Sequence, residues 1–177
     1  MRMRGWMLGA CALVAAGPAQ SEEIYAKIGR WEISAEPPSP GCMMSAAYAS
    51  KDGKKLETLT VGYAGDKVGG LLVWSNDWMT YLPAEGDLEL GLAFKKGSSA
   101  DQSWGSRNFH YHKVNDTYIF KLVFTKAEEV QRLVRDIADS ERLGLLLGPA
   151  LTANLPLDAA AAVEKLRECS VNGGRAP

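Results

Sequence analysis

The strict alternation of apolar and polar residues over 87–94 constrains the fold most strongly. Apolar side chains take every second position there, at Leu88, Leu90, Leu92 and Phe94. Neighbouring side chains of a strand point to opposite faces of a sheet, so this pattern predicts a half-buried strand. Similar but shorter patterns predict strands over 31–36, 42–50, 59–63, 71–75, 106–113 and 117–125. Short turns such as Asp52-Gly53 and Asn115-Asp116 favour antiparallel pairing, in a meander or sandwich-like sheet of about six to eight strands.

The last third of the chain changes to a helical period. Thr125 and Glu128 have the spacing of a capping box, and an amphipathic helix is predicted behind them to an end near Ser140. Residues 143–147 form a short apolar strand or the start of an irregular crossing. Asp158 is predicted to cap a C-terminal helix over 159–169. The fold class is therefore α+β, with one mid-to-late helix and one C-terminal helix.

The first 19 residues have the features of a secretory signal peptide. Arg2 and Arg4 precede an uncharged apolar run over 8–16, and small residues at 17–19 predict cleavage after Ala19. Residues 20–177 would then form a single periplasmic or secreted domain. No later segment is long and apolar enough to cross a membrane. An alternative is that the lipoprotein-like sequence ending at Cys11 is lipidated and anchors the chain.

Charge and glycine patterns exclude some partners. Cleavage leaves 18 basic against 21 acidic residues, a formal net charge of −3, which argues against nucleic acid as a partner. Gly69-Gly70 lacks the flanking glycine spacing of a dinucleotide site, and no phosphate loop is present, so no cofactor is predicted.

Two of the three cysteines, Cys42 and Cys169, remain after cleavage. An even number in an oxidising compartment predicts one disulfide, which would close most of the chain. The loop-entropy treatment assigns such a closure roughly 5 kcal/mol. Two free thiols are the alternative, and a redox-active pair is disfavoured because no Cys-x-x-Cys occurs.

His110 and His112 are the only histidines. They lie two apart on a predicted strand, so both side chains face the same way and could bind zinc or copper with a third ligand. Asp101 or Asp116 is the candidate for that ligand, which would make the chain a metal-binding protein or a metal-dependent hydrolase. The simpler interpretation is that both histidines face solvent, because Phe109 and Tyr111 alternate with them as core residues.

No catalytic residue is predicted from the remaining motifs. The serines at 98, 99, 103 and 106 lie in a polar loop without a Gly-x-Ser-x-Gly elbow, and an oxidised cysteine cannot attack a substrate. Glu85, Asp87 and Glu89 could hold calcium or act as paired carboxylates, but their alternation is also that of a solvated strand face.

Aromatic residues give a further binding hypothesis. Trp74 and Trp78 flank a predicted turn, Tyr81 follows, and Trp104 lies in a later loop. Exposed indoles can stack on sugars or anchor a protein partner. Tryptophan also fills the cores of small domains, and this second interpretation competes with the first.

The two ends of the predicted mature chain carry a family resemblance. The order Gly29-Arg30-Trp31-Glu32-Ile33, Gly41-Cys42-Met43-Met44 and Leu155-Pro156-Leu157-Asp158-Ala159, with Ala161-Ala162 and Leu166, resembles small periplasmic proteins of proteobacteria. Among named groups it is most similar to the invasion-associated locus B family, although a central cysteine pair usual in that family is absent. The resemblance implies an exported, disulfide-bearing protein without established enzymatic activity. We therefore expect a non-enzymatic binding or envelope-associated protein, with an unknown protein or glycan partner in the envelope.

Overall fold

The computed structural model describes residues 23–35, 41–50, 53–65, 69–97 and 102–174. The predicted signal peptide, with Cys11, lies outside these residues. Within them the chain forms ten strands and two helices. They are β1 (Glu23–Ile28), β2 (Trp31–Ala35), β3 (Cys42–Ala49), β4 (Leu56–Tyr63), β5 (Gly70–Asn76), β6 (Glu85–Lys95), β7 (Gln102–Val114), β8 (Thr117–Phe124), α1 (Ala127–Asp139), β9 (Arg142–Leu147), β10 (Ala150–Pro156) and α2 (Ala160–Val171).

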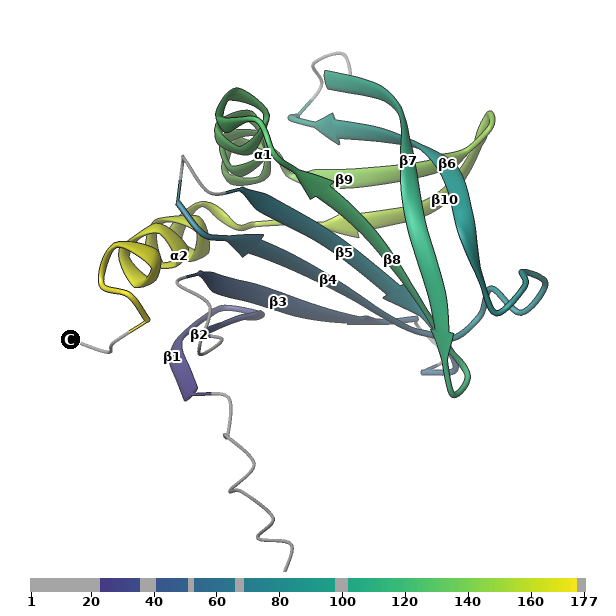
Figure 1. The fold of residues 1–177 in the computed structure, drawn as a ribbon, viewed down its shortest axis with the longest axis horizontal. Coiled ribbons are helices and arrows are strands. Elements are labelled where there is room, and N and C mark those ends of the chain that lie inside the picture. The colour runs from purple at the N-terminus through teal and green to yellow at the C-terminus, as the bar shows by residue number, and fades with distance from the viewer. Residues whose placement is uncertain (1–22, 36–40, 51–52, 66–68, 98–101, 175–177) are drawn as a thin grey trace, which may run out of the picture.

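All described strands belong to one antiparallel sheet, in the order β1-β2-β3-β4-β5-β8-β7-β6-β9-β10 (Figure 1). The first five strands form the predicted meander. After β5 the chain crosses past two strand positions to β6, so that the β6–β7–β8 hairpins run back and place β8 beside β5. Helix α1 then carries the chain from β8 to β9, which pairs with the free side of β6.

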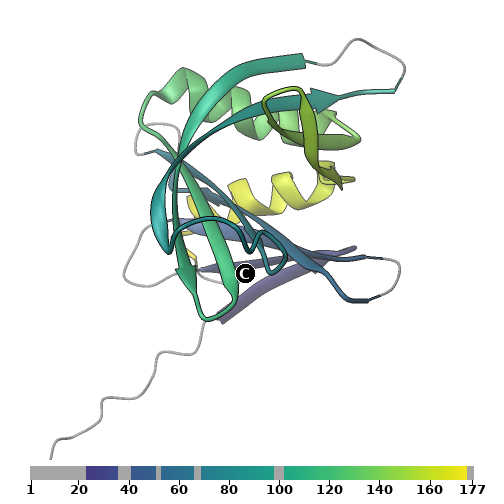
Figure 2. The ribbon, with the colours of Figure 1, turned by 90° about the vertical axis from the view of Figure 1, so that its right-hand side faces the viewer.

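The predicted α+β class with a β-rich antiparallel sheet is confirmed, but a sandwich of six to eight strands is wrong. The ten strands of the described chain form a single sheet that curls into a half-barrel (Figure 2). Sequence patterns missed β1 and β10 because each contains a register shift, between Ile24 and Ala26 and between Leu151 and Ala153, which interrupts the period of two. Gly148, with a φ of +59°, lies in the turn of the β9–β10 hairpin.

The core lies between the concave face of the sheet and the two helices. Helix α2 packs on β1 to β4, and α1 packs on β8 and α2. The predicted apolar face of α1 is confirmed, because Val130, Leu133, Val134 and Ile137 are all buried. Large aromatic side chains from the strands, including Trp31, Phe94 and Phe109, fill the space opposite.

Both predicted helix caps are wrong. The N-cap residue of α1 is Lys126 rather than Thr125, and that of α2 is Ala159 rather than Asp158; neither makes a side-chain capping bond. Strand β8 ends at Phe124 and leads almost directly into α1, so the first helical turn starts one residue after the capping pattern. Asp158 has a φ of +45°, outside the extended conformation that a capping side chain needs.

A disulfide joins Cys42 at the start of β3 to Cys169 in α2. Their Cα atoms lie 6.1 Å apart although 127 positions separate them in sequence, and both side chains are buried. The bond therefore fixes α2 against the sheet. Neither described helix is long and apolar enough to cross a bilayer.

Candidate functional site: a pocket at the seam of the half-barrel

The curled sheet does not close, because its edge strands β1 and β10 do not pair with each other in the described chain. We call the opening between these two edges the seam, and a cavity lies in it. Strand β2 pairs with β3 only from Glu32–Ser45 to Ala35–Cys42, so in the described pairings β3 beyond Ser45 has a neighbour only on its β4 side. The indole N–H of Trp31 donates to the carbonyl of Leu157 at 2.9 Å and ties the start of β2 to the chain after β10. Next to this link, β3 and β10 enclose about 310 Å³, which we call the seam pocket. Its lining residues are Arg30, Ala47, Tyr48, Ala49, Ser50, Glu57, Asn154, Leu155 and Pro156.

Tyr48 is a partly buried lining residue of this pocket whose hydroxyl group is buried. Its phenolic oxygen is inaccessible to solvent and has no hydrogen-bond partner among the described residues. Burial raises the pKa of Tyr48 to about 12, although the Arg30 guanidinium opposes the shift. A buried hydroxyl without a partner costs about 1–3 kcal/mol. A polar ligand or a water in the pocket would offset this cost.

Arg30 places a positive charge at the same site. It follows Gly29, whose φ of +59° makes the tight β1–β2 turn, and its guanidinium carbon lies 5.3 Å from the centre of the Tyr48 ring. The arginine side chain is a natural ligand for planar anions because its donors form a fixed fork. No described carboxylate forms a salt bridge with Arg30, so this fork is available to a ligand.

Glu57 supplies the acidic group, directly opposite Tyr48 on β4. One of its carboxylate oxygens accepts a hydrogen bond from the Trp74 indole N–H at 3.1 Å. Trp78 packs edge-on against Trp74, with ring centres 6.0 Å apart, and its own buried N–H has no described partner. Trp74 therefore holds a carboxylate that lines the pocket, although neither Trp74 nor Trp78 is itself a lining residue.

Trp74 and Trp104 are core residues, as the second of the two aromatic interpretations expects. Trp74 is fully buried and Trp104 is only 6% exposed, so the three indoles do not gather in an exposed recognition patch. Trp104 lies on β7 instead, where its N–H donates to Asp136 on α1 at 2.8 Å and the Arg132 guanidinium covers its ring. Tyr81 is exposed. Alternation on the concave face explains the burial, because Trp74 shares that face with Leu72.

The histidines lie on the opposite, convex face, far from this pocket in the sheet order. Phe109 and Tyr111, which alternate with the histidines along β7, are buried on the other face of the sheet, as the solvent-facing interpretation requires. His110 is half exposed, with its two ring nitrogens 3.5 Å from Glu85 and 3.3 Å from Asp87. His112 pairs with Glu85 in the β6–β7 register and is partly buried.

The predicted third metal ligand does not join these histidines in the described chain. The Asp116 side chain is almost fully exposed and lies 3.8 Å from the Lys113 ammonium, while Asp101 lies outside the described residues. Glu89 continues the same solvent-facing row as Glu85 and Asp87. Among the described residues, no group of three or more histidine, cysteine, aspartate or glutamate side chains is placed to hold a metal ion.

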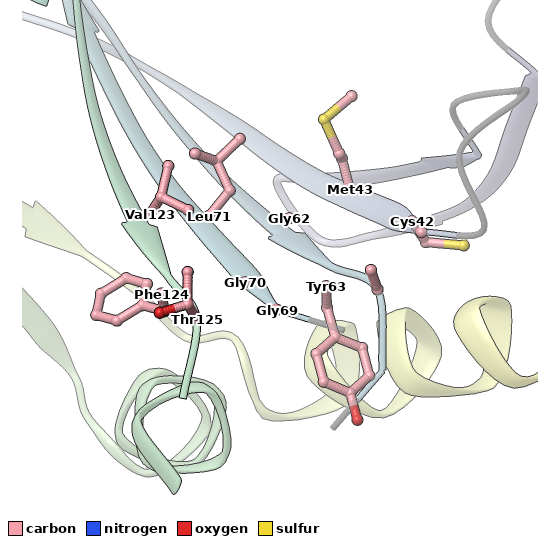
Figure 3. Close-up of a pocket in the computed structure, with 12 residues that line it drawn as sticks. Cys42, Met43, Gly62, Tyr63, Gly69, Gly70, Leu71, Val123, Phe124 and Thr125 are labelled. Carbon is pink, nitrogen blue, oxygen red and sulfur yellow. The ribbon is translucent and has the colours of Figure 1, made fainter. Parts of the chain in front are cut away.

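A second cavity, of about 240 Å³, lies on the face opposite the helices (Figure 3). Met43, Gly62, Leu71 and Val123 are successive partners across β3, β4, β5 and β8, and the missing side chain of Gly62 leaves a trough between its neighbours. Figure 3 shows Met43, Leu71 and Val123 projecting on the same side of the sheet. No charged side chain lines this groove, so it offers little to orient a ligand.

Arg30, Tyr48, Glu57 and Asn154 were all missed as site residues from the sequence. They come from a turn and three different strands, and no spacing relates them. The only signal was indirect: Tyr48 is the one large residue among the small residues 45–50.

The seam pocket brings together four kinds of polar group. It combines a guanidinium, a carboxylate, a phenol and an amide, groups that fix the orientation of a compact polar ligand. Comparison with protein-family models, curated proteins and solved structures gives no match for this chain. The resemblance to the invasion-associated locus B family therefore stays a prediction.

Proposed function

We propose that this chain is an exported, non-enzymatic binding protein of the cell envelope that holds a compact polar ligand in the seam pocket. One observation carries the proposal: the buried Tyr48 hydroxyl has no partner among the described residues, and the Tyr48 ring lines a cavity that also presents the Arg30 guanidinium without a described carboxylate partner. Buried polar groups of a folded protein are nearly always hydrogen-bonded. A site that leaves such groups open is suited to a ligand that supplies their partners.

The size and the walls of the pocket also suit this role. About 310 Å³ is at the lower end of the range for small-ligand sites, roughly 300–1,000 Å³. The Trp31–Leu157 hydrogen bond and the Trp74–Glu57 hydrogen bond brace the two sides of the cavity. A braced site loses less conformational entropy on binding than a mobile one does.

An extracytoplasmic location is supported by two features. The Cys42–Cys169 disulfide is compatible with an oxidising compartment, and residues 1–19 have the pattern of a cleaved signal. Intact-mass measurement on protein purified from the periplasm tests this part. We expect a mass that begins at Gln20 and lacks two hydrogens, whereas a lipid on Cys11 would make the chain an anchored lipoprotein.

The binding site is tested by titrating a library of small polar molecules into the ¹⁵N-labelled, disulfide-intact protein. We expect ligands to shift the backbone amides of 46–50, and we expect Tyr48→Phe and Arg30→Gln to weaken binding. Lys121→Gln is the matched control, because Lys121 is an exposed cation on the convex face. Ligands that bind both pocket variants as tightly as the wild type would contradict the proposal.

A further inference from the structure

We infer that the seam pocket receives the C-terminal end of an extended peptide, which adds to the open edge of β3 and places its carboxylate at Arg30. This inference rests on the proposed function, since it names the ligand class of the same site. It combines three observations: a strand edge with no partner in the described pairings, a cation beside it, and a cavity lined by both.

The strand edge comes first. Residues 42–45 of β3 have partners on both sides, in β2 and β4, whereas in the described pairings 46–49 have partners only in β4. In an antiparallel strand every second residue directs its N–H and C=O away from a given neighbour. The N–H and C=O groups of every second residue of 46–49 therefore face the seam, where Ala47 and Ala49 line the cavity without a bulky side chain. An extended peptide is the ligand that matches such an edge at the spacing of a strand.

The position of Arg30 indicates which end of the peptide binds. If the β2–β3 register, in which Glu32 faces Ser45, continued for two more residues, Arg30 would face Ala47. The chain turns away instead, and Arg30 lies over the Tyr48 ring. A peptide that pairs with β3 beyond the point where β2 stops therefore has one of its ends next to the Arg30 guanidinium. A terminal carboxylate is the peptide group that forms paired, charge-assisted hydrogen bonds with such a fork.

The other charged group of the pocket orients the peptide. Glu57 lies on β4, on the side of Tyr48 away from the open edge, and it already accepts the Trp74 N–H. Like charges repel in a partly buried site, so the ligand carboxylate is held away from Glu57 and toward Arg30. The Tyr48 ring lines the same cavity, and its buried hydroxyl, which has no partner among the described residues, can donate to a peptide oxygen once the ring turns toward the ligand.

The opposite wall is a poorer template than β3. Pro156 has no backbone N–H, and the Asn154 carbonyl already accepts a hydrogen bond from Arg142 at 3.1 Å. We therefore expect β3 to provide the backbone pairing and β10 to provide a wall. The volume of about 310 Å³ limits the bound segment to the last few residues of the peptide.

The test compares three probes by NMR titration of the disulfide-intact protein: N-acetyl-trialanine with a free carboxylate, the same tripeptide as its C-terminal amide, and N-acetyl-alanine. We expect the free acid to shift the amides of 46–50 and the amide probe to bind about tenfold more weakly. N-acetyl-alanine has the carboxylate but cannot pair along β3, so we expect it to bind more weakly as well. In Arg30→Gln the difference between acid and amide should vanish, and in Lys121→Gln it should persist.

Several results would overturn the inference. Equal affinity for acid and amide would remove the role of the carboxylate, and equal affinity for N-acetyl-alanine and the tripeptide would remove strand addition. If no peptide binds but small polar molecules shift the amides of 46–50, the inference fails while the proposed function stands. If neither class shifts these amides, both fail.

Discussion

The Cys42–Cys169 disulfide is predicted to supply a large share of the stability of this fold. Replacing both cysteines by alanine removes a cross-link between positions 127 residues apart. For a loop of that length the chain-entropy treatment gives about 5 kcal/mol at 25 °C, because the cross-link restricts the unfolded chain. Net stabilities of small domains are about 5–15 kcal/mol, so the double variant should lose at least about a third of the wild-type stability and, at the lower end of this range, all of it.

Urea unfolding followed by tryptophan fluorescence measures this effect. With a typical slope of about 2 kcal/mol per molar urea, a loss of about 5 kcal/mol lowers the midpoint by about 2.5 M. Reduced wild type is the control, because it keeps both buried sulfur atoms and loses only the covalent bond. We expect it to resemble the Cys42→Ala/Cys169→Ala variant. A midpoint within 0.5 M (about a fifth of the expected shift) of the oxidised protein in both samples would refute the loop-entropy reasoning.

Three further predictions concern the core, the pocket and one turn. Trp104→Phe removes the donor 2.8 Å from the buried Asp136 carboxylate and should cost about 2 kcal/mol in urea unfolding; an unchanged midpoint would contradict this. Because the folded-state pKa of Tyr48 is about 12 against 10.0 in a model phenol, the folded protein keeps a proton that the unfolded chain releases. Stability should therefore fall between pH 10 and 12, and Tyr48→Phe should lessen that fall; an equally steep fall in the variant would count against the shift. In Gly69→Ala the added Cβ would lie 2.9 Å from the Phe124 carbonyl oxygen, at a φ of +140°. The melting temperature of this variant should therefore drop more than that of Gly53→Ala, whose added Cβ has no atom within 4 Å. Equal drops would exclude the clash.

Local patterns in the sequence were sufficient for much of the secondary structure. The alternation over 87–94 corresponds to β6, and the apolar helical face behind Thr125 corresponds to α1. These predictions succeed because period and side-chain polarity are properties of the chain itself, and a half-buried element must match them to bury its apolar face. The pairing of Cys42 with Cys169 followed from a count of cysteines together with the predicted cleavage.

Other elements depended on their neighbours and were missed or misplaced. Strands β1 and β10 lie at the two edges of the sheet, and each contains a register shift that hides its alternation. Ile24 and Leu151 are exposed although they are apolar, so burial does not follow polarity there. The two helices do not start behind Thr125 and Asp158 as predicted, because the connections from the preceding strands determine where the first helical turn forms.

By itself, the sequence determined a β-rich α+β chain, most of its strands, the face of α1 that packs inward, and the pair of cysteines that meet. Only the tertiary structure decided that the sheet curls as one layer, that Trp74 and Trp104 are buried, and that the seam pocket exists. Arg30, Tyr48 and Asn154 are brought together there from a turn and two distant strands. The physical reason is that local periodicity reports which face of an element is buried. Where a curled sheet ends, and which of its edges stay unpaired, depends on the sum of strand lengths, twist and helix packing over the whole chain.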